Sequence, residues 1–498
     1  MTVTRDLRPG YGRKLALITA GGAVFRLALL ARQPLGTDED FTAAVVARQL
    51  GDMLGVVSRD SAPPLFYVLE WLVAQVAHGP AAMRIVPALA GIALIPLLAA
   101  LARRVSGDAA GLSAAVFAAV LPTTLLSSEN ARMYSLAGAL VVAAMLLLWR
   151  AVESPKRPPS DATRSPEERP KAVRWIAYGA VAAAAVWTDY FAAIAIVGVL
   201  GAVAWLRPGR RNLVLAGLIS AGTAASVGPW LLFARSQLEH AGQGFWIPPL
   251  SPSSIAGTFG QLFAGPPIDS GVPYRELLVA LQIIEVVAGC VALASAAVTW
   301  RRLPREGRRA AAFCLAAAGG VAVLAGVSLW RPILEARYAD VMWLPLFALC
   351  GVGLAAMPRR LAVALVAAAA IGSLALGTAI THPETASLLP EIESRVRPQD
   401  LVAADPDRYL LLLVDGSPEL RARLHVLAQS DPPWYFGTAA YPPDAVWHSV
   451  PPEIAVSGGV VFFVGAPGAT PPPLPPGYRQ LGRRCATGVC LTTYGAKP

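Results

Sequence analysis

Apolar runs long enough to cross a lipid bilayer constrain this chain more than any other feature. A transmembrane helix needs about 17–25 mostly apolar residues. Residues 175–206 suffice for two short spans with Asp189 at the turn between them, and nine single runs lie at 15–31, 85–102, 109–127, 133–149, 212–234, 277–300, 310–330, 339–357 and 361–381. Only 15% of the 498 residues are charged, against about 25% in soluble domains. The sequence predicts an all-α polytopic membrane protein with about eleven transmembrane helices.

The positions of the basic residues indicate how these spans are threaded. Residues 64–78 are short for a crossing and contain Glu70. If they lie along the membrane surface, a cytoplasmic N-terminus places more than half of the 42 Lys and Arg residues in cytoplasmic segments, as the positive-inside rule requires. We therefore expect 64–78 to be interfacial. Residues 41–57, with one apolar helical stripe, are expected to form another interfacial helix. The net charge of +10 then reflects membrane topology and does not indicate nucleic-acid binding.

This threading divides the chain into two domains. Residues 1–381 form the transmembrane domain, which includes an external loop at 31–84 with the interfacial helices. Its cytoplasmic loop at 151–173 is rich in Pro, Ser and charge and is predicted to be disordered. Residues 382–498 are expected to form a small external α/β domain, with strands at "DLVAAD", "LHVLAQ" and "GGVVFFVGA" and a helix at "PDRYLLLLV". Cys485 and Cys490 could close a disulfide there if this side is oxidising.

Acids and arginines from distant segments fall on the external side. The acidic stretch 38–40 could be only a hydrated loop, and Glu129 with Arg132 could be a structural i,i+3 ion pair on a helix. Charges near bilayer depth are costly, however, and tend to be functional. A secondary transporter would place ionisable residues near mid-membrane, where only Arg26 and Glu285 stand. A scaffolding protein would leave the external charges without a purpose. The pattern favours an enzyme working at the external face.

Five pieces of sequence, in order, carry a resemblance to a known family. They are Asp38-Glu39 with Phe41-Thr42, "DSAPPLFYVLEWL", "RIVPALAGIALIPLLAALARRVSGDAAGLSAAVFAAVLP", "SENARMYSL" and "ARYADVMWLPLF". Together they resemble the polyprenyl-phosphate-dependent membrane glycosyltransferases of the GT-C fold, in the bacterial protein mannosyltransferase and aminoarabinose transferase branch. The resemblance covers about residues 15–381 and is strongest over 36–150. The chain departs from it at Ala62, where relatives commonly have His before Pro-Pro, which puts the acceptor class in question.

The resemblance implies a role for each matching residue. Asp38 would be the general base. Either Glu39, as the second catalytic residue, or Asp40 would orient that base or the acceptor, and Asp60 and Glu129 would line the same cavity. Arg132 and Arg337 would bind the lipid-linked phosphate. The full set of substrate-binding residues implied is Asp40, Asp60, Tyr67, Glu129, Arg132, Tyr134, Asp189, Arg337 and Tyr338.

The chemistry of such a reaction suits these residue types. An acceptor hydroxyl is a poor nucleophile, and a positioned carboxylate base typically contributes about 10²–10⁴-fold. The departing phosphate gathers negative charge, which the planar donor fork of arginine matches. A base opposite a cationic clamp favours in-line displacement and inversion at the anomeric carbon.

We therefore expect a glycosyltransferase of the cell (inner) membrane that moves a hexosyl or pentosyl group from a polyprenyl phosphate. The acceptor would be an external hydroxyl of a cell-envelope glycan, lipid or protein. No cofactor is demanded, although carboxylates could bind Mg²⁺ or Mn²⁺. The alternatives are a lipid-linked polymer ligase or polymerase and a secondary transporter.

Overall fold

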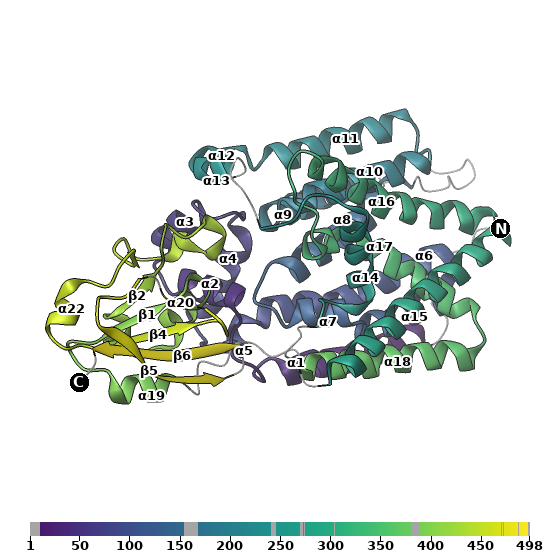
Figure 1. Cartoon of the computed structure of the whole chain (residues 1–498). Helices are drawn as coiled ribbons and strands as arrows, with labels where there is room; N and C mark the ends of the chain where they lie inside the picture. Colours follow the sequence, from purple (N-terminus) through teal and green to yellow (C-terminus); the bar gives the residue numbers. More distant parts are fainter. Residues whose placement is uncertain are drawn as a thin grey trace, which may run out of the picture.

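A layer of long helices and a smaller sheet domain at one end of it make up the structure (Figure 1). The computed structural model describes residues 10–153, 168–240, 246–268, 272, 274–302, 304–379, 388–469, 471, 473–486 and 488–496. Most of the loop predicted to be disordered, and the predicted domain boundary at 381–382, lie outside these ranges.

Each of the predicted apolar runs is helical in the structure. The helices are α1 (Tyr11–Leu29), α6 (Ile85–Val120), α8 (Tyr134–Val152), α9 (Glu168–Thr188), α10 (Phe191–Trp205), α11 (Arg210–Ala225), α12 (Gly228–Phe233), α15 (Arg275–Arg302), α16 (Pro304–Ser328), α17 (Ala336–Ala356) and α18 (Arg359–Ala379). The long α6 contains the run at 85–102 and most of the run at 109–127, whose last residues lie in α7 (Pro122–Ser128). It bends between the two runs, where Ser106 and Gly107 leave helical geometry. Asp189 lies in the turn between α9 and α10, as predicted.

The protein is a multi-pass membrane protein. Among the described residues, seven helices are long and apolar enough to span a bilayer: α6, α8, α11 continued by α12, α15, α16, α17 and α18. The helices α9 and α10 are apolar but shorter, and α1 carries Arg13, Lys14 and Arg26. Eleven crossings therefore remain a prediction, while the helical elements that would make them are present.

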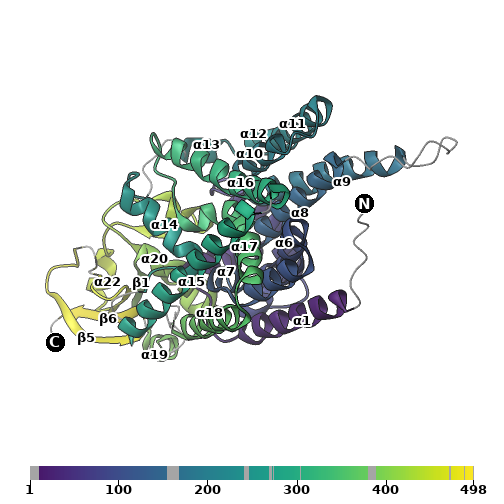
Figure 2. The same ribbon diagram turned by 90° about the vertical axis from the view of Figure 1, so that its right-hand side faces the viewer.

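The centre of the helical layer is α17, which lies against α6 (Figure 2). In α17, 83% of the apolar stretch is buried, compared with 28% in each of α11, α15 and α18. Small residues allow this close approach: a side chain added at Gly351 would collide with Ala114 of α6, and one at Gly353 with the main chain of α15. Gly and Ala at helix contacts are typical of membrane bundles, because dispersion contacts drive association there.

The basic clusters assigned to one side of the membrane do gather at one end of the helices. Arg104 pairs with Glu153 at 3.1 Å, and Arg309 donates to the Arg104 carbonyl at 2.7 Å. Arg308 donates in the same way to the Trp205 carbonyl at 3.2 Å. The bend of α6, the ends of α8 and α10 and the start of α16 therefore lie together, as the threading requires.

Between α1 and α6 lie four short helices, α2 (Thr37–Val46), α3 (Leu50–Val57), α4 (Leu65–Ala74) and α5 (Pro80–Met83). The ten residues of α4 are too few to cross a bilayer, which agrees with the interfacial prediction. The single helix expected over 41–57 is wrong, because the chain breaks at 47–49 between α2 and α3. Tertiary contacts hold that break: Trp71 Nε1 donates to the Arg48 carbonyl at 3.0 Å, and the Arg48 guanidinium donates to the carbonyl of Ala440.

The other short helices are α7 (Pro122–Ser128), α13 (Arg235–His240), α14 (Pro252–Ala264) and α19 (Leu389–Arg395). Residues 129–133, between α7 and α8, are not helical. The helical i,i+3 pair considered for Glu129 and Arg132 is therefore not formed.

The C-terminal domain is built on a six-stranded sheet in the order β3-β2-β1-β4-β6-β5. Its strands are β1 (Leu401–Ala404), β2 (Leu424–Leu427), β3 (Val446–Trp447), β4 (Val461–Gly465), β5 (Tyr478–Ala486) and β6 (Val489–Ala496). The first four pair in parallel, and β6 pairs antiparallel with β4 and β5. The helices are α20 (Pro406–Asp415), α21 (Pro418–Arg421) and α22 (Pro452–Val456), and the 3-10 turns are η1 (Trp434–Phe436) and η2 (Thr438–Ala440).

The predicted elements of this domain are confirmed at β1, β2, β4 and α20. The hairpin of β5 and β6 was not predicted, because most residues of β5 face solvent and show no apolar alternation. A disulfide between Cys485 and Cys490 closes the hairpin, as the sequence suggested.

Candidate functional site

A cavity of about 380 Å³ opens between α2, the start of α17 and the C-terminal domain. Seven of its sixteen lining residues are aromatic. Five are charged: Asp38, Asp60, Arg132, Arg337 and Asp407. Residues separated by hundreds of positions in the chain therefore meet around one cavity.

Asp38 lies in the first turn of α2, where the helix dipole favours a negative charge. Its Oδ2 accepts a hydrogen bond from Arg337 Nη1 at 2.5 Å, and 48% of its side chain remains open to the cavity. Burial by itself would raise the pKa of Asp38, but the nearby charges of Arg132 and Arg337 outweigh it and hold this pKa below its usual value. The carboxylate is therefore ionised and paired.

Arg132 comes from the non-helical segment between α7 and α8. Its Nη1 donates to the hydroxyl of the buried Tyr67 on α4 at 3.3 Å and reaches the main-chain oxygen of Asp38 at 3.4 Å. Its guanidinium carbon lies 5.9 Å from the ring centroid of Phe41. These contacts hold a permanent positive charge directly beside Asp38.

Arg337, at the start of α17, is the second arginine that contacts Asp38. Its guanidinium is 5.1 Å from the ring centroid of Trp246 and 5.5 Å from that of Tyr338, distances at which cation–π attraction operates. The Tyr338 ring stacks in turn on Phe191 at 4.5 Å. Aromatic faces thus orient the second cation without consuming its hydrogen-bond donors.

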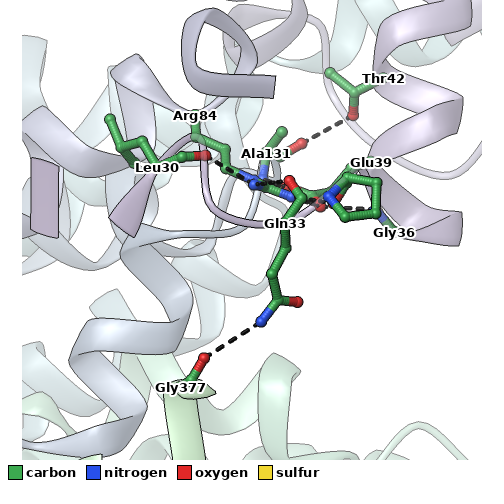
Figure 3. Close-up of polar contacts among 9 residues, drawn as sticks. Leu30, Gln33, Gly36, Glu39, Thr42, Arg84, Ala131 and Gly377 are labelled. Carbon is green, nitrogen blue, oxygen red and sulfur yellow. Dashed lines mark hydrogen bonds and ion pairs between the residues drawn. The ribbon is translucent and has the colours of Figure 1, made fainter. Parts of the chain in front are cut away.

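Glu39 forms a buried double hydrogen bond with Arg84, the residue before α6 (Figure 3). The Arg84 Nε and Nη2 donate to the two carboxylate oxygens at 2.7 and 2.6 Å, and only 2% and 1% of the two side chains are exposed. The remaining Arg84 donors reach the carbonyls of Leu30, Gln33 and Pro34. The charge on Arg84 is therefore fully compensated, as a buried ion pair requires.

The same Glu39 carboxylate ties the segment that carries Arg132 to α2. It accepts the main-chain N–H groups of Gly36 and Ala131, each at 2.8 Å, while Thr42 Oγ1 donates to the Ala131 carbonyl at 2.9 Å (Figure 3). Both main-chain groups of Ala131 are thus held by α2. Because Asp38 precedes Glu39 and Arg132 follows Ala131, this network fixes Asp38 and Arg132 relative to each other.

A larger cavity of about 890 Å³ adjoins the first and shares Ser61, Arg132, Tyr134, Tyr338 and Trp434 with it. Apolar side chains such as Phe191, Leu231 and Ile247 line much of the rest. Ala62 also lies on this wall, at the position where relatives commonly have histidine.

Asp189 is the acid of this second cavity. Its Oδ1 accepts the main-chain N–H of Phe191 at 2.9 Å. Burial raises the pKa of Asp189 to about 6, although the Phe191 N–H and Arg132 act in the opposite direction. The group can therefore exchange a proton near neutral pH.

The structure distributes the predicted site residues over three locations. The first cavity is lined by six of them: Asp38, Asp60, Arg132, Tyr134, Arg337 and Tyr338. Tyr67 lies directly behind as a partner of Arg132, and Asp189 lines the second cavity. The others, Glu39, Asp40 and Glu129, are not on the wall of either cavity.

Asp40 is buried and Glu129 half-buried, both away from the cavities. No group among the described residues hydrogen-bonds to the carboxylate of Asp40, and burial, followed by the charges of Asp415 and Glu39, raises its pKa well above the usual value. Burial also raises the pKa of Glu129 to about 7, against the pull of Arg26, Arg84 and Arg32. Both acids therefore lie near the Glu39–Arg84 pair, contrary to the expectation that Glu129 lines the cavity with Asp60.

Sequence reasoning missed several residues of the site, among them Arg84, Trp246, Asp407 and residues 434–437. Arg84 is the first residue of the segment that begins "RIVPALAG", but the sequence indicated no role for it. The aromatic run "WYFG" at 434–437 was visible in the tail, but nothing in the sequence placed it near α2. Within the described ranges, no group of three His, Cys, Asp or Glu residues could hold a metal ion.

Comparison with known proteins shows the fold. ArnT from Cupriavidus metallidurans bound to undecaprenyl phosphate superimposes with a TM-score of 0.58 at 15% identity, over 97% of this chain and 99% of that one. The same protein in the apo state gives a TM-score of 0.61 at 14% identity. The archaeal oligosaccharyltransferase AglB from Archaeoglobus fulgidus, in complex with an inhibitory peptide and a dolichol-phosphate, gives 0.53 at 13% identity, over 83% of this chain and 65% of that one.

No protein-family model and no curated protein matches the sequence. Shared architecture at such low identity shows the fold alone, and that fold is GT-C, in the ArnT-like arrangement of a helical membrane layer with a C-terminal sheet domain.

Proposed function

We propose that this GT-C-fold chain is an integral membrane glycosyltransferase, which moves a sugar from a polyprenyl-phosphate donor to an acceptor hydroxyl. The observation that carries the proposal is the meeting of Asp38, Arg132 and Arg337 in one cavity, beside a second and largely apolar cavity. The structural likeness to an ArnT that binds undecaprenyl phosphate supports it.

The lipid carrier would occupy the 890 Å³ cavity, with its phosphate at the junction of the two cavities. Arg132 lines both cavities, and Arg337 lines the first, where it pairs with Asp38. Arginine suits this position because its charge is permanent and its donors match phosphate oxygens in pairs. Tyr134, Tyr338 and Asp60 would contact the donor or the sugar from the same walls.

In the proposed reaction, Asp38 accepts the proton of the acceptor hydroxyl. The acceptor oxygen forms a bond to the anomeric carbon, and the bond from that carbon to the phosphate oxygen breaks. The electron pair stays on the polyprenyl phosphate, where Arg132 and Arg337 stabilise the charge. Attack from the side opposite the phosphate inverts the anomeric configuration.

The ion pair of Asp38 with Arg337 implies that the donor binds before the acceptor reacts. A carboxylate whose pKa is held low is a weak base, and Arg337 contributes to that low pKa. A donor phosphate that takes the Arg337 hydrogen bonds would release Asp38 and raise its basicity. Donor binding would therefore prepare the base before the acceptor reacts.

Glu39 is a positioning residue in this proposal, since its carboxylate is committed to Arg84, Gly36 and Ala131. Asp40 and Glu129, which lie off the cavity walls, would act on the reaction only through neighbours. Asp189 would contact the carrier side of the donor.

The site would face the outside of the cell membrane, with the gathered basic clusters in the cytoplasm. The Cys485–Cys490 disulfide supports this orientation, because such bonds persist in oxidising compartments. The acceptor would then be a glycan, lipid or protein of the cell envelope.

The test is Asp38→Asn in the full chain reconstituted in nanodiscs. Donors would be a panel of hexoses and pentoses linked to undecaprenyl phosphate or to undecaprenyl diphosphate. Cell-envelope fractions would serve as acceptor, and the released lipid carrier would be measured by mass spectrometry. We expect turnover to fall by about 10²–10⁴-fold while undecaprenyl-phosphate binding persists. Asp52→Asn, which changes an exposed acid on α3, is the matched control.

Near wild-type turnover in Asp38→Asn would rule out this base. Consumption of diphosphate donors only, with release of undecaprenyl diphosphate, would assign the chain to the polymer ligases and polymerases instead.

A further inference from the structure

The C-terminal domain covers the catalytic cavity and contributes six of its lining residues. These are Asp407 and Leu410 of α20 and the consecutive residues Trp434, Tyr435, Phe436 and Gly437. We call this set the roof. It belongs to the C-terminal domain, whereas Arg132 and Arg337 belong to the helical layer, and the donor phosphate proposed above leaves it without a function.

The roof is held firmly beside Asp38. Gly437 has φ +72°, a conformation that favours glycine, and a Cβ there would lie within 2.8 Å of Phe41 on α2 and 2.9 Å of Leu410. On the next turn, the guanidinium of Arg59 donates to the Ala439 carbonyl at 3.3 Å, and that of Arg48 donates to the carbonyl of Ala440. The wall is therefore preorganised, which reduces the entropy cost of binding.

The main chain of the roof is already hydrogen-bonded within its own turns. The N–H groups of Phe436 and Gly437 donate to the carbonyls of Pro433 and Trp434. A peptide that binds in extended form uses free main-chain groups at a sheet edge, and this surface is a turn. Recognition here must come from side chains: half-buried aromatic rings and one carboxylate.

Asp407 supplies the polar group of the roof. Among the described residues, no side chain donates a hydrogen bond to its carboxylate, which lines the cavity half-buried. Burial raises the pKa of Asp407, Arg408 opposes this, and the negative charge of Asp38 adds to it. A ligand that donates hydrogen bonds at this point would relieve the cost of holding two carboxylates near one cavity.

Aromatic faces beside a hydrogen-bond-accepting carboxylate suit a sugar ring. The π faces are negative and contact the C–H surfaces of the ring, while hydroxyl groups donate to the carboxylate with the strength of charge-assisted hydrogen bonds. The volume of about 380 Å³ lies within the range of about 300–1,000 Å³ that small-molecule sites occupy.

We propose that the roof is the acceptor subsite and that the acceptor is a saccharide, bound by stacking on Trp434 and Tyr435 and by hydrogen bonds to Asp407. This inference rests on the proposed glycosyl transfer and adds to it the class of the acceptor and the residues that select it. The bound hydroxyl would then face Asp38 from the side opposite the donor phosphate.

The test measures binding to the full chain in nanodiscs by saturation-transfer NMR. The probes are methyl α-D-mannopyranoside, methyl α-D-arabinofuranoside and the peptide acetyl-Ala-Thr-Ala-amide. The affinity for undecaprenyl phosphate is measured in a separate titration. We expect at least one glycoside to bind. We expect Asp407→Asn to weaken it about 10-fold or more, as the loss of a hydrogen bond to a charged group does, and Trp434→Ala to weaken it as well.

The control is Asp431→Asn, an exposed acid of the same domain that pairs with His448 at 3.3 Å. It should leave glycoside binding unchanged, and both Asp407→Asn and Asp431→Asn should keep wild-type affinity for undecaprenyl phosphate. Trp434 also lines the second cavity, so Trp434→Ala serves only the glycoside measurement. A wild type that binds neither glycoside, glycoside binding that Asp407→Asn leaves unchanged, or selective peptide binding would overturn the proposal. A wild type that fails to bind undecaprenyl phosphate would refute the proposed function itself, so the two failures are distinguishable.

Discussion

Replacing Glu39 by glutamine should damage both the stability and the activity of the protein, although Glu39 lies outside both cavities. Its carboxylate accepts four hydrogen bonds, from Arg84 Nε and Nη2 and from the main-chain N–H groups of Gly36 and Ala131. A glutamine side chain keeps the shape but offers one acceptor oxygen, and it leaves the Arg84 charge buried without a counter-charge. Breaking a buried pair in this way costs about 3–5 kcal/mol.

The expected shift in melting temperature follows from the chain length. At about 2.1 cal/mol/K per residue for a globular protein, complete unfolding of the 498 residues would give an entropy on the order of 1 kcal/mol/K. This is an upper bound, because helices in lipid keep their main-chain hydrogen bonds, and the loss should therefore lower Tm by at least roughly 3–5 °C. Turnover should fall by up to about 10²-fold, because a displacement of about 1 Å between catalytic groups has that effect.

The assay is thermal unfolding in nanodiscs, with turnover measured in parallel, for Glu39→Gln, Arg84→Met and the double variant. The double variant removes both charges and should recover part of the lost stability, which a double-mutant cycle measures as a coupling energy. Glu391→Gln is the control, since it breaks exposed pairs with Arg395 and Arg484 that are each worth about 0–1 kcal/mol. A Glu39→Gln variant with unchanged Tm and turnover would refute the idea that this pair positions Asp38 and Arg132.

Two further predictions concern the phosphate clamp and the topology. Arg337→Gln should weaken undecaprenyl-phosphate binding and raise the pKa of Asp38, since burial then acts with less opposition. The acidic limb of kcat/KM, which needs ionised Asp38, should then move to higher pH, and a limb that stays in place would contradict the role of this ion pair. A cysteine at the exposed Val456 should react with an impermeant thiol reagent in intact cells, and one at Arg359 should not; the opposite labelling would reverse the proposed orientation.

The sequence by itself determined the elements that depend on local pattern. Apolar runs of spanning length became helices because a segment in lipid must satisfy its main-chain hydrogen bonds internally. The strands β1, β2 and β4 and the helix α20 followed from short apolar runs between turn residues. Asp38, Arg132 and Arg337 were placed at one end of the spans by counting crossings, and the structure brings them together.

Only the tertiary structure decided which of the neighbouring acids face the cavity. Asp38, Glu39 and Asp40 are consecutive on α2, and successive helical residues point about 100° apart, so they enter three different surroundings. One meets the cavity, one pairs with Arg84 and one is buried with no hydrogen-bond partner among the described residues. The local sequence does not show which groups of the folded chain surround each of these three side chains. The roof shows the same limit, because its position beside Asp38 depends on Phe41, Leu410 and Gly437 fitting together across hundreds of residues.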